Sequence, residues 1–146
     1  MERMRRIVTD EVQEPPPGLW SNCRTFGQQV YISGLVAMDQ GGIIGEGDPH
    51  RQAMHIFETM RHYLRAAGGQ MNDVINLNIY VTDMKHRPAV LDARRRFFSG
   101  DFPCSTLVAV TALIDPRLLV EINAVAFVGA GALPTDADTN NDITED

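Results

Sequence analysis

Two apolar runs typical of β-strands close the folded part of the chain and constrain its fold more than any other feature. The runs are Ser105–Thr111 and Leu118–Val128, and a turn at Asp115-Pro116 joins them. Short apolar runs bounded by turns are typical of strands in the buried part of a sheet. Glu121 is the single charged residue in the second run. A carboxylate inside such a run is costly unless it has a partner or a chemical role, so Glu121 is the first candidate functional residue.

The rest of the chain predicts further strands and two helices. The first helix is expected to begin after Asp48, a capping residue type, with Pro49 in its first turn, and to end at Gly68-Gly69. The second is expected from Pro88 to about Phe98. The other strands are predicted at Ile7-Val8, Asn22–Phe26, Gln29–Gly34, Ile43-Ile44 and Val74–Val81. This order predicts an α+β domain with helices against one sheet face.

Length and charge place the chain among ordinary globular proteins. A chain of 146 residues predicts one domain, here residues 5–130, followed by an acidic segment, 131–146, that is expected to be disordered. The net charge is −6, and five acidic residues without a basic one lie between Thr135 and Asp146. Subtracting those five charges leaves about −1 for the rest of the chain, so no overall field favours nucleic acid.

The remaining composition predicts a cytoplasmic protein without a cofactor. No apolar run is long enough to span a membrane, and the first thirty residues lack the apolar core of a signal peptide. Cys23 and Cys104 lack the spacing of metal ligands and are expected to be reduced. Cys104 could be a nucleophile or a redox sensor, but no histidine lies next to it in sequence, so a buried structural residue is predicted. We therefore expect no metal, no cofactor and no membrane partner.

Two segments together resemble the Rid family, the reactive intermediate deaminases, also called the YjgF family. They are Phe97–Val128 and the run VYISGLVAMDQGGIIGEGD that begins at Val30, and the resemblance covers roughly Arg5 to Val128. It implies a mixed β-sheet backed by two helices in the chorismate mutase-like arrangement. It also implies a homotrimer that hydrolyses enamines and imines to ketones and ammonia in clefts between subunits. A sheet with helices on one face only independently favours an oligomer.

The resemblance also implies which residues line the cleft. The family's serine-glycine pair matches Ser33-Gly34, its water-activating glutamate matches Glu121, and an aromatic position matches Trp20. One carboxyl group can both activate a water and protonate departing ammonia. Each residue also has a plain structural interpretation. Ser33-Gly34 could simply end a strand, Glu121 could face solvent or an arginine, and Trp20 could anchor the proline-rich connector.

One family residue is replaced in this chain. The family's deaminases hold the substrate carboxylate with an arginine two residues after a phenylalanine-proline pair, whereas Phe102-Pro103 is followed by Ser105. Ser105 and Thr106 could bind a carboxylate through hydrogen bonds, but more weakly than a guanidinium. The sequence leaves three arginines as possible replacements: Arg24, Arg94 and Arg117.

Two functional hypotheses follow. The first is an imine or enamine hydrolase whose substrate range is altered by the lost arginine, with weak activity on small enamino acids such as 2-aminoacrylate unless another cation takes over. The second is a non-catalytic trimer that binds or senses a small molecule. The lack of a basic stripe argues against ribonuclease activity and against a nucleic-acid partner.

Overall fold

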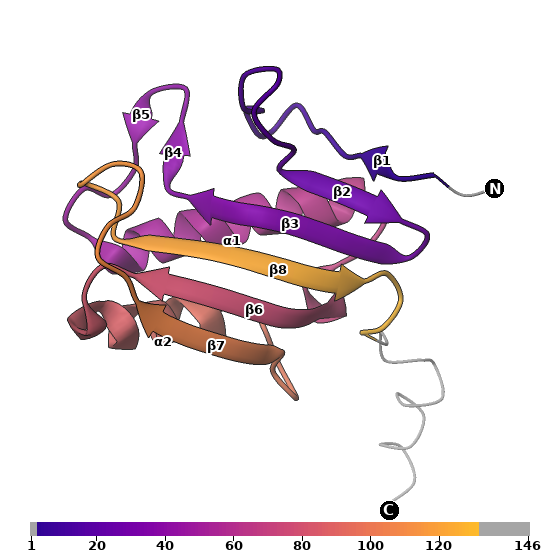
Figure 1. Ribbon diagram of the computed structural model, residues 1–146. Helices are drawn as coiled ribbons and strands as arrows, with labels where there is room; N and C mark the ends of the chain where they lie inside the picture. Colours follow the sequence, from indigo (N-terminus) through magenta and orange to yellow (C-terminus); the bar gives the residue numbers. More distant parts are fainter. Residues whose placement is uncertain (1–2, 132–146) are drawn as a thin grey trace, which may run out of the picture.

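A six-stranded sheet with helices on one face forms the body of this computed structural model, which describes residues 3–131. The strand order is β1-β2-β3-β8-β6-β7, and β6 and β7 are parallel while the other neighbouring pairs are antiparallel. The six strands are β1 Arg5–Arg6, β2 Cys23–Phe26, β3 Gln29–Val36, β6 Val74–Val81, β7 Cys104–Ala109 and β8 Val120–Phe127. The predicted mixed sheet backed by two helices is confirmed (Figure 1).

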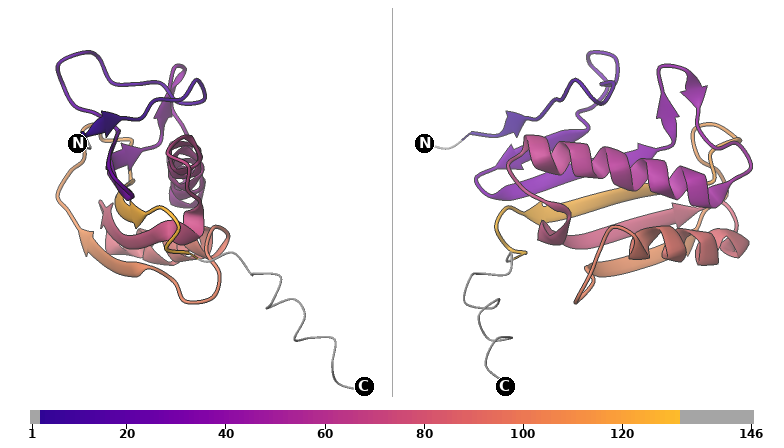
Figure 2. Two further views of the ribbon diagram at one scale, coloured as in Figure 1. Left: turned by 90° about the vertical axis from the view of Figure 1, so that its right-hand side faces the viewer. Right: turned by 180° about the vertical axis from the view of Figure 1, so that it is seen from behind.

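The helices α1, Pro49–Ala66, and α2, Arg87–Arg95, lie on one face of the sheet, in front of it in the right-hand view of Figure 2. The side chain of Asp48 accepts a hydrogen bond of 3.0 Å from the backbone N–H of Arg51, which caps the first turn of α1 as predicted. Gly68 follows the helix with φ of 87°, a conformation that favours glycine and ends the helix. Two 3-10 turns, η1 Met71–Asp73 and η2 Met84–His86, precede β6 and α2.

The core lies between the sheet and the helices. Alternate residues of β8 point into it, because successive side chains of a strand face opposite sides. One face of α1 is buried there, and Ala67, which follows the helix, is only partly covered. Two polar residues of α1, Gln52 and Tyr63, are also fully buried. The buried apolar residues of α1 are Ala53, Ile56, Phe57, Met60 and Leu64, and those of β8 are Val120, Ile122, Ala124 and Ala126.

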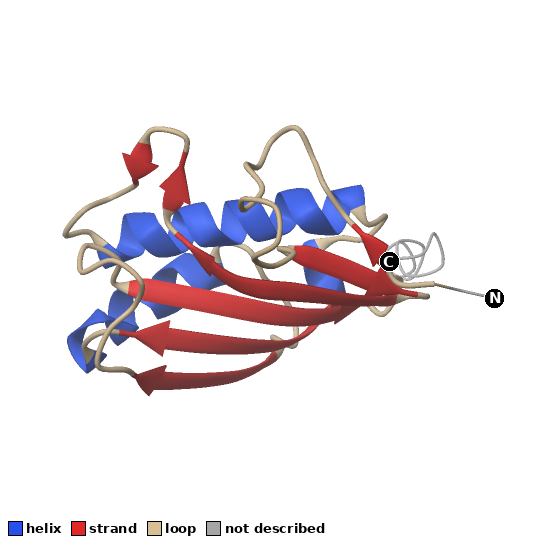
Figure 3. Ribbon diagram, turned by 45° about the horizontal axis from the view of Figure 1, so that its top comes forward, coloured by secondary structure: helices blue, strands red, loops and turns tan. Residues whose placement is uncertain are grey.

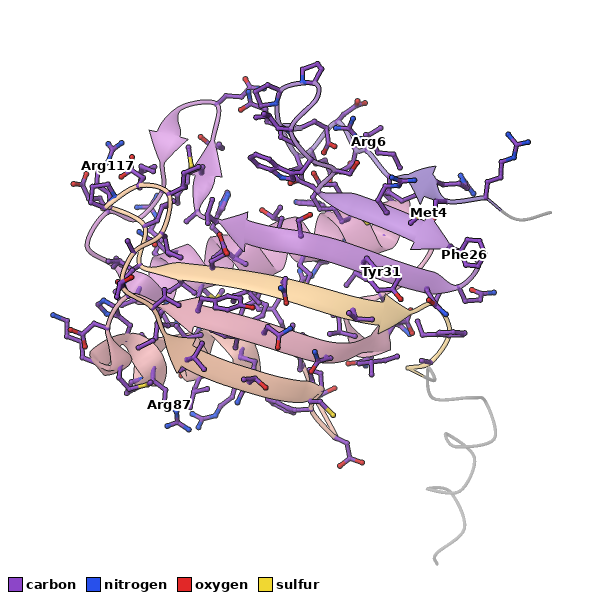
Figure 4. The ribbon with its side chains drawn as sticks, viewed as in Figure 1. Met4, Arg6, Phe26, Tyr31, Arg87 and Arg117 are labelled. Carbon is purple, nitrogen blue, oxygen red and sulfur yellow. The ribbon has the colours of Figure 1, made fainter. Side chains whose placement is uncertain are left out.

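The other face of the sheet carries no helix, as Figure 2 shows. Large apolar side chains are exposed on it or beside it, among them Tyr31, Val108 and Phe127 at 47%, 42% and 41%. The side chain of Tyr31 is labelled on this face in Figure 4. The sheet therefore offers an apolar surface that a single chain leaves open to solvent.

The structure corrects the prediction for the strand Ser105–Thr111. The observed strand, β7, is shorter, and five of its six residues are exposed because it forms the sheet edge. The prediction that Cys104 is buried is wrong for the same reason, since Cys104 is the first residue of this edge strand and is exposed.

Smaller differences concern element boundaries. The strand predicted at Ile7-Val8 pairs at Arg5–Arg6 instead, although the Ile7 N–H still donates to the Cys23 carbonyl at 3.0 Å. The second helix ends at Arg95, before the predicted Phe98. The segment around Ile43 forms the second strand of a small hairpin, β4 Met38–Asp39 and β5 Gly42–Ile43. The acidic tail lies outside the described residues from position 132 onward.

Two projections flank one end of β3, as Figure 3 shows. One is the β4–β5 hairpin, and the other is the loop that includes the proline connector at residues 14–18. The connector is fastened through Glu14, whose carboxylate accepts hydrogen bonds from Arg6 at 2.9 Å and from the buried Tyr63 hydroxyl. The sheet thus provides a floor, and these loops provide two walls.

Candidate functional site

A cleft of about 560 Å³ lies between the connector, the hairpin and the adjoining ends of β3 and β8. Its lining is mostly apolar, with a few polar groups, which is typical of small-molecule sites. Four of the six predicted site residues line it together, and they come from three separate segments of the chain. They are Trp20, Ser33, Gly34 and Glu121.

The floor of the cleft is built on a break in the sheet. Between Ile32 and Leu35 the register of β3 against β8 shifts, so Ser33-Gly34 forms a bulge. The backbone N–H of Ser33 donates to the Asn22 carbonyl at 2.9 Å, and its hydroxyl donates to the Ser21 carbonyl at 2.5 Å. These two hydrogen bonds hold β3 against the segment before β2. The bulge also changes the direction in which Gly34 faces.

Gly34 lies directly against the carboxyl group of Glu121. A Cβ atom added at Gly34 would lie 2.8 Å from both Cδ and Oε2 of Glu121. Real Cβ atoms do not approach other heavy atoms that closely, so glycine is required for this packing. The glycine thus fixes where the Glu121 carboxylate stands in the cleft.

Glu121 is a half-buried carboxylate on the strand that lines the cleft floor. Its cross-strand neighbours are Val36 on β3 and Tyr80 on β6, and no arginine, lysine or histidine of residues 3–131 forms a salt bridge with it. Burial raises the pKa of Glu121 above its ordinary value of 4.5, because the charged form loses hydration. A carboxyl group with a raised pKa both accepts and returns a proton more readily near neutral pH.

Trp20 is held in the wall by a hydrogen-bonded chain. Its indole Nε1 donates to Asn22 Oδ1 at 2.9 Å, and Asn22 Nδ2 donates to the Tyr63 hydroxyl at 2.9 Å. The ring remains 49% exposed, so it offers an aromatic surface to the cleft rather than filling the core. The Tyr63 hydroxyl in turn donates a hydrogen bond to Glu14, so the same chain of hydrogen bonds joins Trp20 to the proline connector.

The other two predicted site residues do not line the cleft of a single chain. Ser105 and Thr106 lie on β7, the edge strand, which is separated from β8 by β6. Thr106 aligns with Asn78 on the neighbouring strand, and Ser105 aligns with the buried Leu77, so the two side chains point to opposite sides of the sheet. A second subunit would be needed to bring either residue to Glu121.

None of the three candidate replacement arginines lines the cleft within the described part of the chain. Arg94 donates a hydrogen bond of 2.8 Å to the Ser105 hydroxyl. Arg117 is labelled on the β7–β8 loop in Figure 4. Its guanidinium donates two hydrogen bonds of 3.0 Å to the carboxylate of Asp115. Arg24 lies on β2, opposite Tyr31.

Sequence reasoning missed several lining residues. Glu14, Asn22, Asp39 and Ile114 contribute to the cleft, although they lie in loops or in the small hairpin. The prolines after Glu14 indicate a non-helical connector but not the surface over which it folds. The glycines after Asp39 indicate a turn but not its direction, so tertiary structure alone places both residues here.

Replacing Gly34 with alanine should displace the Glu121 side chain while leaving the fold intact. The backbone of Gly34 is outside the left-handed region, and the clash is with the far end of a flexible side chain. We expect any reaction that depends on Glu121 to slow about ten- to a hundredfold, because misplacement of a catalytic group by about 1 Å has that effect. Steady-state rates would measure the slower reaction, and thermal melting would show whether the fold is retained. Unchanged rates would show that the reaction does not require Glu121 at the position seen in the structure.

Among residues 3–131, no helix is both long and apolar enough to cross a membrane. In the same range, no three histidine, cysteine, aspartate or glutamate side chains are grouped so that they could hold a metal ion.

Comparisons with known proteins agree with this architecture. A family model described as Endoribonuclease L-PSP matches residues 12–128. A solved protein of unknown function from Pseudomonas aeruginosa is 36% identical, with a TM-score of 0.79, covering 88% of this chain and 94% of that one. RidA from an Antarctic Psychrobacter species is 30% identical, with a TM-score of 0.77 and coverage of 85% and 99%. A Mycobacterium tuberculosis member of the YjgF/YER057c/UK114 family is 32% identical, with a TM-score of 0.68 and coverage of 75% and 86%.

Proposed function

The chain belongs to the endoribonuclease L-PSP family, also called the YjgF or Rid family, and on that premise we propose that it hydrolyses imines or enamines. The observation that carries the proposal is the carboxylate of Glu121, half-buried on the cleft floor, packed on Gly34 and without an ion-pair partner in residues 3–131. A carboxylate so placed can act on a water molecule beside a bound substrate.

The proposed reaction converts a protonated imine and water into a ketone and ammonium. A water oxygen bonds to the imine carbon, Glu121 takes one proton from that water, and the electron pair of the carbon–nitrogen double bond moves to nitrogen. Glu121 then gives its proton to the nitrogen, and the carbon–nitrogen bond breaks. The hydroxyl group on carbon then loses its proton and becomes the ketone carbonyl. That proton joins the released ammonia, which departs as ammonium. An enamine enters the same route once its carbon is protonated.

We place this reaction in a homotrimer. The helix-free sheet face with Tyr31, Val108 and Phe127 supports assembly, since burial of exposed apolar surface favours association. The position of Ser105 and Thr106 on an edge strand supports a composite site, in which a neighbouring subunit supplies them to the cleft.

Assembly can be measured directly. Native mass spectrometry and light scattering of the full chain should give the mass of three subunits, about three times 16.2 kDa. A monomer at micromolar concentration would contradict both the assembly and the composite site.

A non-catalytic binding protein is the second candidate. The serine at position 105 favours it, because the family's carboxylate-binding arginine is absent there. Ribonuclease activity is less well supported, since none of the described residues that line the cleft is basic and RNA binding depends strongly on phosphate neutralisation.

The activity test uses cyclohexanimine, released in the assay by flavin oxidation of cyclohexylamine, and 2-iminopropionate, released from alanine. We expect the protein to accelerate formation of cyclohexanone beyond the spontaneous rate, and to act less on 2-iminopropionate. A trimer that accelerates neither reaction would support the binding protein instead.

A further inference from the structure

The segment that forms one wall of the cleft is held by few hydrogen bonds. Residues 12–16 and Trp20 line the cleft. Within the described chain, no backbone hydrogen bond joins residues 13–20 to another segment. Three of these residues, Pro15, Pro16 and Pro17, have no N–H to donate. The hydrogen bonds that hold this wall to the rest of the protein therefore come from side chains.

The side-chain hydrogen bonds of the wall converge on the hydroxyl of Tyr63, a fully buried residue of α1. Trp20 Nε1 donates to Asn22 Oδ1 at 2.9 Å, and Asn22 Nδ2 donates to the Tyr63 hydroxyl at 2.9 Å. That hydroxyl donates in turn to the carboxylate of Glu14. Glu14 also pairs at 2.9 Å with Arg6, which Figure 4 labels on β1. One side chain of α1 thus supports both the aromatic ring and the proline connector.

The direction of this chain of hydrogen bonds is fixed at both ends. An indole N–H can only donate, and an ionised carboxylate can only accept. The amide of Asn22 therefore turns its oxygen to Trp20 and its nitrogen to Tyr63, and the hydroxyl proton of Tyr63 points to Glu14. Burial, and then the hydrogen bond to Glu14, raise the pKa of Tyr63, so the hydroxyl keeps this proton at neutral pH. Because each link has a single arrangement, loss of the Tyr63 hydroxyl releases both ends of the chain.

We infer that Tyr63 is a positioning residue of the cleft: its hydroxyl holds the Trp20 ring and the proline connector where they face a bound ligand. The inference rests on the proposed function, since it takes the cleft as the ligand site. It does not depend on the groups that a neighbouring subunit brings, because every link of the hydrogen-bonded chain lies within one subunit. Without the hydroxyl, the wall has to be ordered when a ligand binds, and that ordering lowers affinity.

The fluorescence of Trp20 tests the inference without any catalytic step. Trp20 is the only tryptophan of the chain, so its emission reports on this wall. Tyr63→Phe, made in the full-length protein, keeps the buried ring and removes the hydroxyl. Because the Trp20 ring is 49% exposed, its release should raise acrylamide quenching by about 1.5- to 2-fold, and its anisotropy should decay faster on the nanosecond timescale. Far-ultraviolet circular dichroism of the same sample shows that the fold is retained.

Ligand affinity is the second measurement. Cyclohexanone, the product of the activity test, serves as the probe, and NMR titration gives its dissociation constant. We expect Tyr63→Phe to weaken its binding about three- to tenfold. In a protein that hydrolyses imines, the same variant should raise KM and change kcat by less than about twofold, because Glu121 takes no part in the hydrogen-bonded chain. This split separates positioning of the wall from loss of the chemical step.

Further variants assign the effect to the hydrogen-bonded chain. Glu14→Leu should resemble Tyr63→Phe more closely than Glu14→Gln does, because glutamine keeps an acceptor oxygen for the Tyr63 hydroxyl. Ile79→Val, a change in the buried core outside the chain, is the matched control for a small loss of stability. It should leave both Trp20 quenching and cyclohexanone affinity unchanged, so a general loosening of the protein would not imitate the result.

The outcomes separate this inference from the proposed reaction. Unchanged Trp20 quenching in Tyr63→Phe, or stronger quenching with unchanged cyclohexanone affinity, would overturn the inference and leave hydrolysis to be judged by its own assay. Stronger quenching together with weaker cyclohexanone binding, in a protein that hydrolyses no imine, would support the inference and overturn the reaction.

Discussion

Replacing Gln52 with leucine is expected to lower the free energy of unfolding by about 3–5 kcal/mol. The fully buried side chain of Gln52 makes three hydrogen bonds to backbone groups far apart in sequence. Its Nε2 donates to the carbonyls of Gly45 at 3.1 Å and Arg117 at 2.9 Å, and its Oε1 accepts from the N–H of Leu119 at 2.8 Å. Leucine has a similar size but leaves the Arg117 carbonyl and the Leu119 N–H unpaired, whereas the Gly45 carbonyl still accepts from the Asp48 N–H at 2.8 Å. Each buried unpaired group costs about 1–3 kcal/mol.

Thermal melting checks this expectation. For a chain of this length, that loss corresponds to a fall of about 10–20 °C in the melting temperature. Gln28→Leu is the matched control, because Gln28 is exposed in the β2–β3 turn and should change stability by less than about 0.5 kcal/mol. If both variants melted close to the parent protein, the hydrogen bonds of Gln52 would not hold the segments at Gly45 and Arg117 to α1 as the structure indicates.

Replacing Glu121 with glutamine is expected to lower the rate of imine hydrolysis by about 10²- to 10⁴-fold, the usual contribution of a general acid–base group. Glutamine keeps the size and the packing against Gly34 but cannot take a proton from water. Initial rates of ketone formation measure the effect, and native mass spectrometry of the same sample shows whether assembly is retained.

Stability provides the control for this variant. The pKa of Glu121 is raised in the folded protein by burial, so its protonated form is favoured by folding. This contribution to stability is fully present below the unfolded pKa and is lost as pH rises through the folded pKa. At pH 7 the ionised carboxylate therefore disfavours the folded state slightly, and Glu121→Gln should be no less stable than the parent. A less stable variant would point to a structural role of the charge.

The fold was largely predictable because its signals are local. The alternating and continuous apolar patterns located the principal strands, and Val74–Val81 was predicted with its observed bounds. Asp48, Pro49 and the glycine pair at position 68 located α1. The exposure of β7 was not predictable, since an edge strand and a central strand can have the same apolar pattern.

The candidate site was predictable only in part. Ser33-Gly34 and Glu121 carry a family pattern, and the structure brings both to one cleft with Trp20. Glu14 and Asp39 had no such pattern, because loops that fold over a sheet leave no periodic trace in sequence. The roles of Gln52 and Tyr63 were not predictable either, because a helix pattern does not show which distant groups a buried polar atom will bond. Gln52 joins α1 to Arg117 and Leu119, and the Tyr63 hydroxyl joins two residues of the cleft wall.

The pH dependence of hydrolysis, compared between the parent protein and Glu121→Gln, tests the central role of Glu121 most directly. The ratio of the two rates cancels the titration of the imine itself. If the ionised carboxylate activates water, the ratio should rise with pH through a midpoint above 4.5, because burial raises the pKa of Glu121, and then reach a plateau. A ratio near one at every pH, with both proteins assembled, would contradict the account.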